Sequence, residues 1–534
     1  MIGRRTFVAG GAALSLLPAG RLRAAPQMGF THGVASGEPA AASVLVWTRY
    51  RGLVTPVPLR VELAADPGLR RIVARGTAIA APETDWTART TLIGLEPGRR
   101  WFYRFLGPDG SVSPTGRTAT LPDGLAPRFT MAVFSCANLP FGWFNAYGDA
   151  ARAPEIDLAI HLGDYLYEYA RGIYPSAAET VAGRSIEPAG ELVHLADYRA
   201  RYASYRRDVD LLALHAHVPW LAVWDDHEFA DNAWMDGAYN HDPAKQGDWH
   251  ARRAAAARAW REWMPVSGDN RWRARDVGTL ASLLTLETRT TGRTAEADFY
   301  PLQSPPEGRQ TRLAAFRDGD WQRPDRRMLG EGQEAWLLDE LPAAARRTRY
   351  QVLIQSVPMG MTVMPEVALG WVPGGGAAAR DEVAMLVDAG RVGVPMNMDN
   401  WNGYPAQRGR ILEAASDANA RLIVLSGDSH NSWFYRLRDT KGRKAGVELS
   451  VPSVTSPGFE NWFPTENPSN VAAALVGANP ELCWADTVHR GYGRIVITPQ
   501  AAELQWWRSA PIKSRSANAF LMFSTTAFEG HSGA

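Results

Sequence analysis

Apolar and polar positions divide the chain into two regions with different patterns. Between about residues 30 and 120, short runs rich in β-branched and aromatic residues recur at regular spacing, separated by turn sequences such as Glu96-Pro97-Gly98. The predicted strands are Ser43–Arg49, Leu59–Ala64, Thr87–Ile93 and Trp101–Leu106. This spacing is typical of a small β-sandwich of immunoglobulin or fibronectin type, which we expect over residues 28–122.

From Arg128 onward, uninterrupted apolar runs alternate with helical stretches, which indicates βα units. Such strands are expected inside a sheet covered on both faces, so residues 127–508 are predicted to form a second, larger domain. Its predicted strands are Phe129–Phe134, Ile156–Leu162, Trp220–Trp224, Val352–Ile354, Arg421–Leu425, Val447–Val451, Tyr492–Thr498 and Glu503–Arg508. Its predicted helices are Leu195–Leu214, Asp248–Met264, Gln333–Leu341 and Pro405–Ala420.

Two later segments lack a clear pattern. Gly360–Asn400 is long and rich in Gly and Ala, and we interpret it as a lid or a substrate loop. Residues 509–534 are predicted to form a C-terminal tail that is either mobile or docked on the domain.

The first 25 residues have the pattern of an export signal. Arg4-Arg5 precedes a short apolar stretch, Phe7–Leu17, and Ala24-Ala25 offers a small-residue cleavage site. Paired arginines in this context predict a twin-arginine signal, with the twin-arginine export machinery as a partner. We therefore expect a periplasmic or secreted bacterial protein whose mature chain has no transmembrane segment.

The composition argues against a nucleic-acid partner and is otherwise that of an ordinary globular protein. Hydrophobic residues make up 46% and charged residues 21% of the chain, and the net charge is +1. Without a concentrated basic patch, no nucleic-acid partner is expected. Two cysteines, Cys136 and Cys483, could form one disulfide. Among the 20 tryptophans, Trp401, Trp433 and Trp462 could line pockets, although core packing is favoured for most of them.

Polar clusters follow four of the predicted strands. In chain order they are Cys136, then Gly163-Asp164-Tyr165-Leu166-Tyr167-Glu168, then Asp225-Asp226-His227-Glu228, then Gly427-Asp428-Ser429-His430. Ligands bind beyond the carboxyl ends of strands in open α/β sheets, so these segments bring a thiol, carboxylates, a phenol and imidazoles to one edge. Carboxylates suit hard divalent cations, whereas Cys, Tyr and His suit transition metals. The sequence therefore predicts a metal site.

Each cluster taken alone has a simpler interpretation. A lone buried Cys is usually a packing residue, and Asp225-Asp226 could be the N-cap of a helix. A serine hydrolase is disfavoured because no Gly-x-Ser-x-Gly motif stands at a strand-to-helix turn. The recurrence at four strand ends favours the metal site.

These motifs resemble those of the PhoD-type alkaline phosphatases, a family related to purple acid phosphatases and calcineurin-like metallophosphoesterases. Further matching segments are Gly33–Pro39, Val46–Arg49, Asp231-Asn232, Trp401–Pro405 and Pro452–Gly458. The resemblance implies an α+β multidomain protein in which a four-layer α/β/β/α metallophosphoesterase domain follows the β-sandwich.

The resemblance also implies a site that holds Fe³⁺ and Ca²⁺. Four residues would hold the iron, namely Cys136, Asp164, Tyr167 and His430. Asp164 would bridge to the calcium, with Asp226 and Asp428 as further calcium ligands. Asp225 could replace or assist its neighbour Asp226, and the resemblance does not separate the two.

Residues around this ligand set receive other roles by the same resemblance. His227 is a candidate general acid or transition-state stabiliser, and Asn232 is a weaker candidate for phosphate contact. Glu168 and Glu228 would orient the ligands.

The predicted function is an exported, metal-dependent alkaline phosphatase that cleaves phosphate monoesters, and diesters as well, through a metal-bound hydroxide. One alternative is a phosphodiesterase or phospholipase D-like enzyme with the same site. An alternative of another class is a secreted binding protein with a degenerate phosphatase domain.

Overall fold

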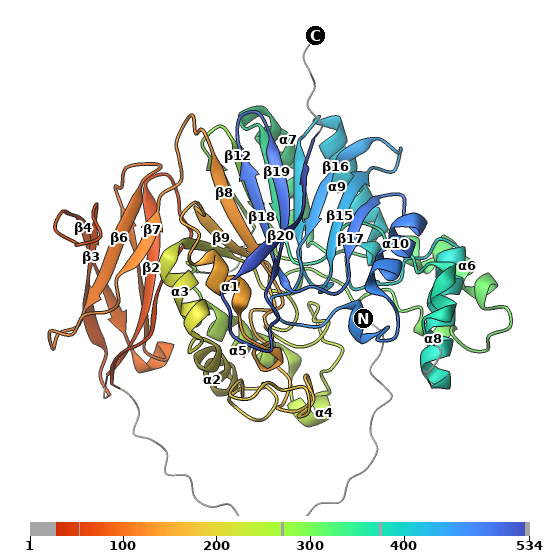
Figure 1. The fold of residues 1–534 in the computed structure, drawn as a ribbon, viewed down its shortest axis with the longest axis horizontal. Coiled ribbons are helices and arrows are strands. Elements are labelled where there is room, and N and C mark those ends of the chain that lie inside the picture. Colours follow the sequence, from red (N-terminus) through yellow and green to blue (C-terminus); the bar gives the residue numbers. More distant parts are fainter. Residues whose placement is uncertain (1–27, 53, 269–271, 373–375, 529–534) are drawn as a thin grey trace, which may run out of the picture.

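The computed structural model describes residues 28–52, 54–268, 272–372 and 376–528, which form three sheets and the helices around them (Figure 1). The predicted export signal, residues 1–25, lies outside the described residues. No helix among the described residues combines the length and the apolar character needed to cross a membrane.

The largest sheet has nine strands. Across the sheet they are β20 (Ala519–Thr526), β19 (Ala502–Ser509), β18 (Gly491–Ile497), β8 (Phe129–Phe134), β9 (Leu158–His161), β10 (Pro219–Ala222), β1 (Gly29–Gly37), β2 (Ser43–Arg51) and β5 (Thr87–Ile93). Strands β8, β9 and β10 are parallel, so their carboxyl ends lie at one edge. The C-terminal strand β18 pairs antiparallel with β8, although the two are far apart in the sequence (Figure 1).

The second sheet has seven strands. Across the sheet they are β11 (Arg273–Val277), β12 (Ala281–Thr285), β13 (Tyr350–Ile354), β14 (Leu422–Ser426), β16 (Lys444–Ser450), β15 (Ser432–Arg438) and β17 (Leu482–Asp486). Strands β12, β13, β14 and β16 are parallel. Strands β11 and β12 follow no run that the sequence analysis had identified.

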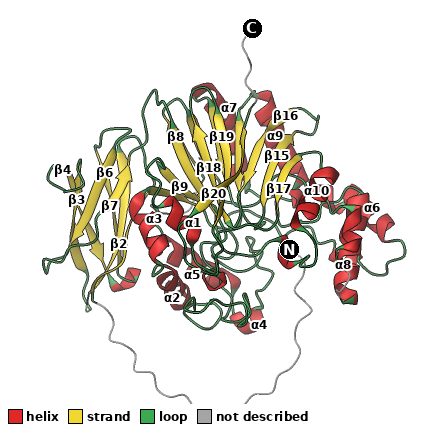
Figure 2. Cartoon of the chain, viewed as in Figure 1, coloured by secondary structure: helices red, strands yellow, loops and turns green. Residues whose placement is uncertain are grey.

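Both large sheets bury apolar side chains on their two faces, as the uninterrupted apolar runs predicted. Along β8, Met131 and Val133 belong to a core shared with the second sheet, whereas Ala132 and Phe134 pack against helices. The helices outside the first sheet are α1 (Asn145–Ala150), α2 (Leu195–Tyr205), α3 (Val209–His217) and α5 (Trp249–Trp263). Those outside the second are α6 (Arg309–Asp318), α7 (Glu331–Arg347), α8 (Ala377–Arg391), α9 (Pro405–Asp417) and α10 (Pro468–Ala478). The order is therefore helices, sheet, sheet, helices (Figure 2).

The N-terminal strands do not form a closed module of their own. Strands β3 (Val57–Ala64), β4 (Ile72–Ala80), β6 (Arg100–Leu106) and β7 (Gly116–Ala119) make a separate four-stranded sheet that shares an apolar core with β1, β2 and β5. However, β1 continues the nine-stranded sheet by pairing parallel with β10. A side chain at Gly37 would be crowded here, because a Cβ would lie 2.1 Å from the carbonyl oxygen of Pro265 and 3.0 Å from that of Trp220 in β10. An immunoglobulin or fibronectin type for residues 28–122 stays a prediction.

Two local predictions need correction, and the structure decides between the two alternatives given for the C-terminal tail. The helix expected over Leu195–Leu214 is broken into α2 and α3, because Asp208 caps α3 by accepting from the backbone N–H groups of Asp210 and Leu211, both at 2.9 Å. The expected loop Gly360–Asn400 contains helix α8. In the expected tail, residues 519–526 form β20, which pairs with β19, so the described part of the tail is docked. Cys136 and Cys483 are both free thiols, one buried and one exposed, and form no disulfide.

Candidate metal centre

The loops after β8, β9 and β14 bring three of the predicted ligands together. One ligand atom from each of Cys136, Asp164 and His430 lies within 4.8 Å of the other two. The Tyr167 hydroxyl joins this group, 3.1 Å from Asp164 Oδ2 and 3.2 Å from His430 Nε2. Four donor atoms of different chemistry thus lie close together beyond the ends of three strands.

The loop after β10 adds further donors next to these. Asp164, Asp226 and His227 form one group of donor atoms within 4.8 Å, and Asp225, Asp226 and Asp428 form another. Asp164 belongs to the group with Cys136 and His430 and to the group with Asp226 and His227, and Asp226 connects the latter to the group with Asp428. The bridging role of Asp164 stays a prediction. The sequence suggested a helix N-cap as an alternative for Asp225-Asp226, but the residues that follow make a turn.

Backbone conformation aims these side chains. Cys136, Asp164, Asp428 and His430 all have positive φ, between 54° and 62°, a region that residues with a Cβ rarely adopt. Each lies directly beyond a strand, where the chain turns sharply toward the site. The turn after β9 is held by hydrogen bonds from the Cys136 N–H to the Gly163 carbonyl at 3.2 Å and from the Ala137 N–H to the Asp164 carbonyl at 2.8 Å.

Glu228 ties two ligand loops to each other. Its carboxylate accepts from the backbone N–H groups of Asp164 at 3.0 Å, Tyr165 at 2.7 Å and Asp225 at 2.8 Å. This matches the orienting role expected for Glu228, since its oxygens contact the backbone of the ligand loops.

Hydrogen bonds also fix the phenol and one imidazole. The Ser456 hydroxyl donates to the Tyr167 oxygen at 2.7 Å. His430 Nδ1–H donates to the Pro457 carbonyl at 2.8 Å, which leaves Nε2 as the nitrogen that faces Tyr167. Both partners lie in Pro452–Gly458, a segment that the sequence analysis quoted without giving it a role.

Burial makes the charged forms of the donors costly. It raises the pKa of the Cys136 thiol, the Asp164 carboxyl and the Asp428 carboxyl well above their usual values, and neighbouring carboxylates raise the thiol and Asp428 values further. Burial followed by Asp164 raises the Tyr167 pKa in the same way. A bound cation would offset this cost by favouring the anionic forms. The donor set therefore suits a soft or strongly acidic transition metal beside a hard cation.

Unpaired polar atoms point to the same conclusion. Asp225 Oδ2 and Asp226 Oδ1 are buried and have no hydrogen-bond partner among the described residues. Buried carboxylate oxygens are normally paired, so two such atoms in one cluster indicate a place for a cation.

Arg289 is a component of the site that sequence reasoning missed. Its guanidinium is fully buried and donates to Asp225 Oδ1 at 2.5 Å and to both oxygens of Asp399 at 2.8 and 2.9 Å. Its Nη2 lies 3.6 Å from Asp226 Oδ1 and 3.8 Å from Asp428 Oδ1. Asp225 is thus already paired with a positive charge.

A signal for Arg289 was present in the sequence. The apolar run Leu280–Leu286 ends in Glu287-Thr288-Arg289, the same strand-then-polar pattern that marked the other four segments. Glu287 shapes this loop by accepting from the Trp224 indole N–H at 2.6 Å and from the Thr290 N–H at 2.8 Å.

His227 stands beside the donor groups with its ring orientation fixed. Its Nδ1–H donates to Glu168 Oε2 at 2.7 Å, so Nε2 is the nitrogen that can reach a substrate. Burial lowers the pKa of His227, but the carboxylates of Asp226, Glu168 and Asp164 outweigh burial and raise the pKa well above its usual value. The ring therefore has the surroundings of a proton donor.

Asn232 lies near Asp226, and its side-chain amide faces Glu296. Its backbone N–H donates to Asp226 Oδ2 at 2.7 Å, while its side-chain Nδ2 is directed toward Glu296 at 3.5 Å. Its Oδ1 is buried without a partner among the described residues. Its phosphate-contact role stays a prediction.

Comparison with known proteins identifies the family to which this arrangement belongs. Residues 131–506 match the PhoD-like phosphatase model, and residues 16–122 match the model of the PhoD-like phosphatase N-terminal domain. The chain belongs to the PhoD-like phosphatase family. It is 32% identical to alkaline phosphatase D of Bacillus subtilis (strain 168), covering 94% of this chain and 83% of that protein.

Solved structures agree with this membership. A structure of PhoD superposes with a TM-score of 0.75 at 29% identity, covering 94% of this chain and 91% of the other. A purple acid phosphatase from yellow lupin (Lupinus luteus) seeds shares the fold, with a TM-score of 0.55 at 11% identity over 93% of this chain and 74% of the other. The protein is thus a phosphoric ester hydrolase of multidomain α/β architecture, and its family implies a metal cofactor.

We expect the Arg289→Met variant to be less stable than the wild type by about 3–5 kcal/mol, because Asp225 would remain buried without its counter-charge and Asp399 would keep only Arg293. The loss of stability in Arg289→Met should be larger at pH 8 than at pH 5. Burial raises the pKa of Asp225, so a stranded carboxyl can take up a proton as the pH falls, and the cost of its charge disappears. Denaturant unfolding of the purified protein at both pH values measures the difference.

Arg323→Met is a matched control, since Arg323 pairs with Asp325 at 2.6 Å on the surface. It should leave the unfolding midpoint unchanged at both pH values. Equal stability of the two variants would show that Arg289 does not compensate the carboxylates.

Proposed function

We propose that the protein is an exported, metal-dependent alkaline phosphatase that hydrolyses phosphate monoesters, with diesters as a second substrate class. The observation that carries this proposal is the convergence of chemically different donors from separate strand ends on adjoining points. These donors are Cys136, Asp164, Tyr167, Asp226, Asp428 and His430. The family membership supports the phosphatase chemistry, and the donor set supports the dependence on metals.

The donor chemistry supports Fe³⁺ and Ca²⁺ as the metals. Cys136, Tyr167, His430 and Asp164 would hold Fe³⁺, because a buried phenol and thiol lose their protons only to a strongly acidic cation. Asp164, Asp226 and Asp428 would hold Ca²⁺ through oxygens alone. Since Asp225 is paired with Arg289 at 2.5 Å, we assign the calcium contact to Asp226 in preference to Asp225.

The residues around the metals would have separate roles in the reaction. Bound metals of this kind polarise phosphate oxygens and acidify water. His227 would donate a proton to the leaving oxygen, with Glu168 holding its ring in place through Nδ1. Glu228 would keep the Asp164 and Asp225 loops at a fixed separation.

We expect Cys136→Ala to lose iron and Asp164→Ala to lose both metals, with hydrolysis of p-nitrophenyl phosphate and of its bis ester falling at least about 100-fold in each variant. The physical reason is that Cys136 belongs to one donor group whereas Asp164 belongs to two. Elemental analysis and p-nitrophenol release from the same preparations measure both effects.

Cys483→Ala serves as the control, because Cys483 is exposed and outside the donor groups. Full activity and full metal content in Cys136→Ala and Asp164→Ala together would end the proposal. Zinc alone in the wild-type protein would contradict the iron and calcium assignment while leaving the hydrolase in place.

We expect His227→Ala to lower kcat by about 10²–10⁴-fold while the metal content stays that of the wild type, as for removal of a general acid. The loss should be greater for an alkyl phosphate than for p-nitrophenyl phosphate, since p-nitrophenolate leaves readily without a proton. Glu168→Gln should show the same dependence on the leaving group in weaker form, because it disturbs only the hydrogen bond to Nδ1. An equal loss on both esters would assign His227 a structural role.

Export through the twin-arginine pathway is supported by Arg4-Arg5 and by the short apolar stretch after them. We expect phosphatase activity in the periplasmic or secreted fraction of cells that express the full chain. With Lys at both arginine positions, the activity should remain in the cytoplasm. An unchanged distribution would contradict this route.

A further inference from the structure

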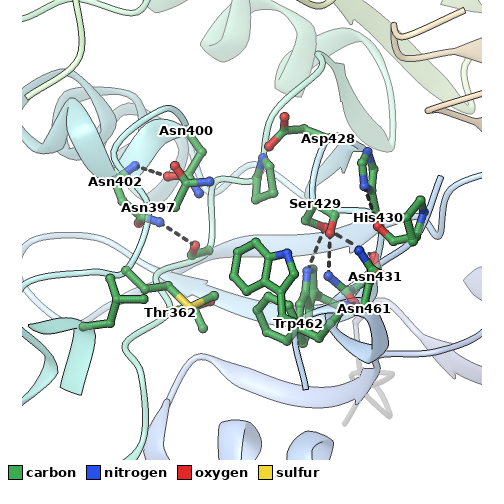
Figure 3. Close-up of a pocket in the computed structure, with 18 of the residues that line it drawn as sticks. Thr362, Asn397, Asn400, Asn402, Asp428, Ser429, His430, Asn431, Asn461 and Trp462 are labelled. Atoms are coloured by element: carbon green, nitrogen blue, oxygen red, sulfur yellow. Dashed lines mark hydrogen bonds between the residues drawn. The ribbon is translucent and has the colours of Figure 1, made fainter. Parts of the chain in front are cut away.

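A pocket opens beside the donor groups and extends away from them. His227 and two of the predicted ligands, Asp428 and His430, line the end of the pocket next to the donor groups. Much of the remaining wall comes from segments 358–362, 396–402 and 457–462 (Figure 3). Because it begins at the proton donor of the proposed reaction, this pocket has the position of a leaving-group site.

Amides and aromatic rings dominate the pocket wall. The amides belong to Asn397, Asn400, Asn402, Asn431 and Asn461. The rings belong to Trp433, Tyr435, Phe459 and Trp462, together with two tyrosines near His227. No Lys or Arg is among the described residues that line it. A second anionic group on the leaving group would therefore find no counter-charge here, and burying it would be costly.

The asparagines on one wall are held in defined orientations. Asn400 Oδ1 accepts from the Asn402 N–H at 2.9 Å, and Asn397 Oδ1 accepts from the Asp399 N–H at 2.7 Å. With these oxygens engaged, each side chain can offer its NH₂ group to a ligand. Asn402 Oδ1 is buried and has no hydrogen-bond partner within the described part of the chain. This wall thus has hydrogen-bond donors, the NH₂ groups of Asn397 and Asn400, beside an unpaired acceptor, Asn402 Oδ1.

Trp462 supplies a flat surface near these amides. Its ring is half-buried and rests against Phe459, with ring centroids 4.9 Å apart and an interplanar angle of 34°. Trp462 lines the same pocket as the asparagines of segment 397–402 and as Asp428 and His430 (Figure 3). A planar group bound over Trp462 would therefore have amides at its edge and the donor groups within reach.

We propose that the pocket binds a nucleoside as the leaving group, so that nucleoside monophosphates are the preferred substrates. The base would stack on Trp462, and the amides would pair with the hydrogen-bonding groups at its edge. This inference rests on the proposed phosphatase function of the same site. In the reaction the P–O bond to the nucleoside breaks, the oxygen of water forms the new P–O bond, and a proton passes to the leaving oxygen.

The test compares the metal-loaded enzyme on adenosine 5′-monophosphate with glycerol 2-phosphate, which has no ring. We expect kcat/KM to favour the nucleotide by at least about tenfold, and Trp462→Ala to reduce this ratio about tenfold, the loss typical of one stacked base. Trp462→Phe should restore most of the ratio. Trp336→Ala removes a half-buried tryptophan of α7 outside the pocket and should leave the ratio as in the wild type.

A ratio near one, a ratio that Trp462→Ala does not change, or a preference for glucose 6-phosphate or adenosine 5′-diphosphate would overturn the nucleoside assignment while leaving the phosphatase intact. If neither ester is cleaved, the proposed function fails instead. Calorimetric titration with adenosine then decides the pocket separately. Binding that Trp462→Ala weakens about tenfold supports the assignment, whereas equal affinity or no binding refutes it.

Discussion

The repulsion among buried carboxylates at the strand ends is the constraint on which the site depends. Asp164, Asp225, Asp226 and Asp428 lie in adjoining groups with almost no exposure to water, where like charges cannot all persist without compensation. Arg289 supplies one permanent positive charge. The remaining positive charge that compensates the carboxylates has to come from protons or from bound cations. Metal content, protonation and stability are therefore linked quantities in this protein.

The same region stores backbone strain. Four of the predicted ligand residues adopt left-handed conformations, each of which costs about 1–2 kcal/mol for a residue with a Cβ. Hydrogen bonds between the loops after β8 and β9, and the three backbone contacts of Glu228, offset this cost. The ligands are thereby positioned by the fold itself, and a cation that binds there does not have to order them.

The local sequence pattern predicted the structural features that depend only on neighbouring residues. The apolar strands and the polar residues that follow them were found because burial on both faces leaves a continuous apolar run, and four of these runs led to the donor groups. Which strands pair with one another in the sheets could not be predicted in this way. The pairing of β1 with β10 joins segments that are far apart in the sequence, and the apolar run at the start of β20, residues 519–523, lies half-exposed at the edge of the sheet. The helix break at Asp208 lies within an unbroken helical periodicity, so only its capping contacts reveal it.

Arg289 shows why a site can extend beyond its recognisable motifs. The guanidinium joins Asp225, next to the metal ligands, to Asp399, which lies in the segment that carries the pocket asparagines. Arg293 donates to the same Asp399 carboxylate, so two buried cations fix a loop that has no strand of its own at this point. Since Asp399 lies between Asn397 and Asn400, the pocket wall keeps its distance from the donor groups through this charge pair. In the proposed function, metal binding and substrate selection would therefore share one positive charge, and a substitution of Arg289 would act on both.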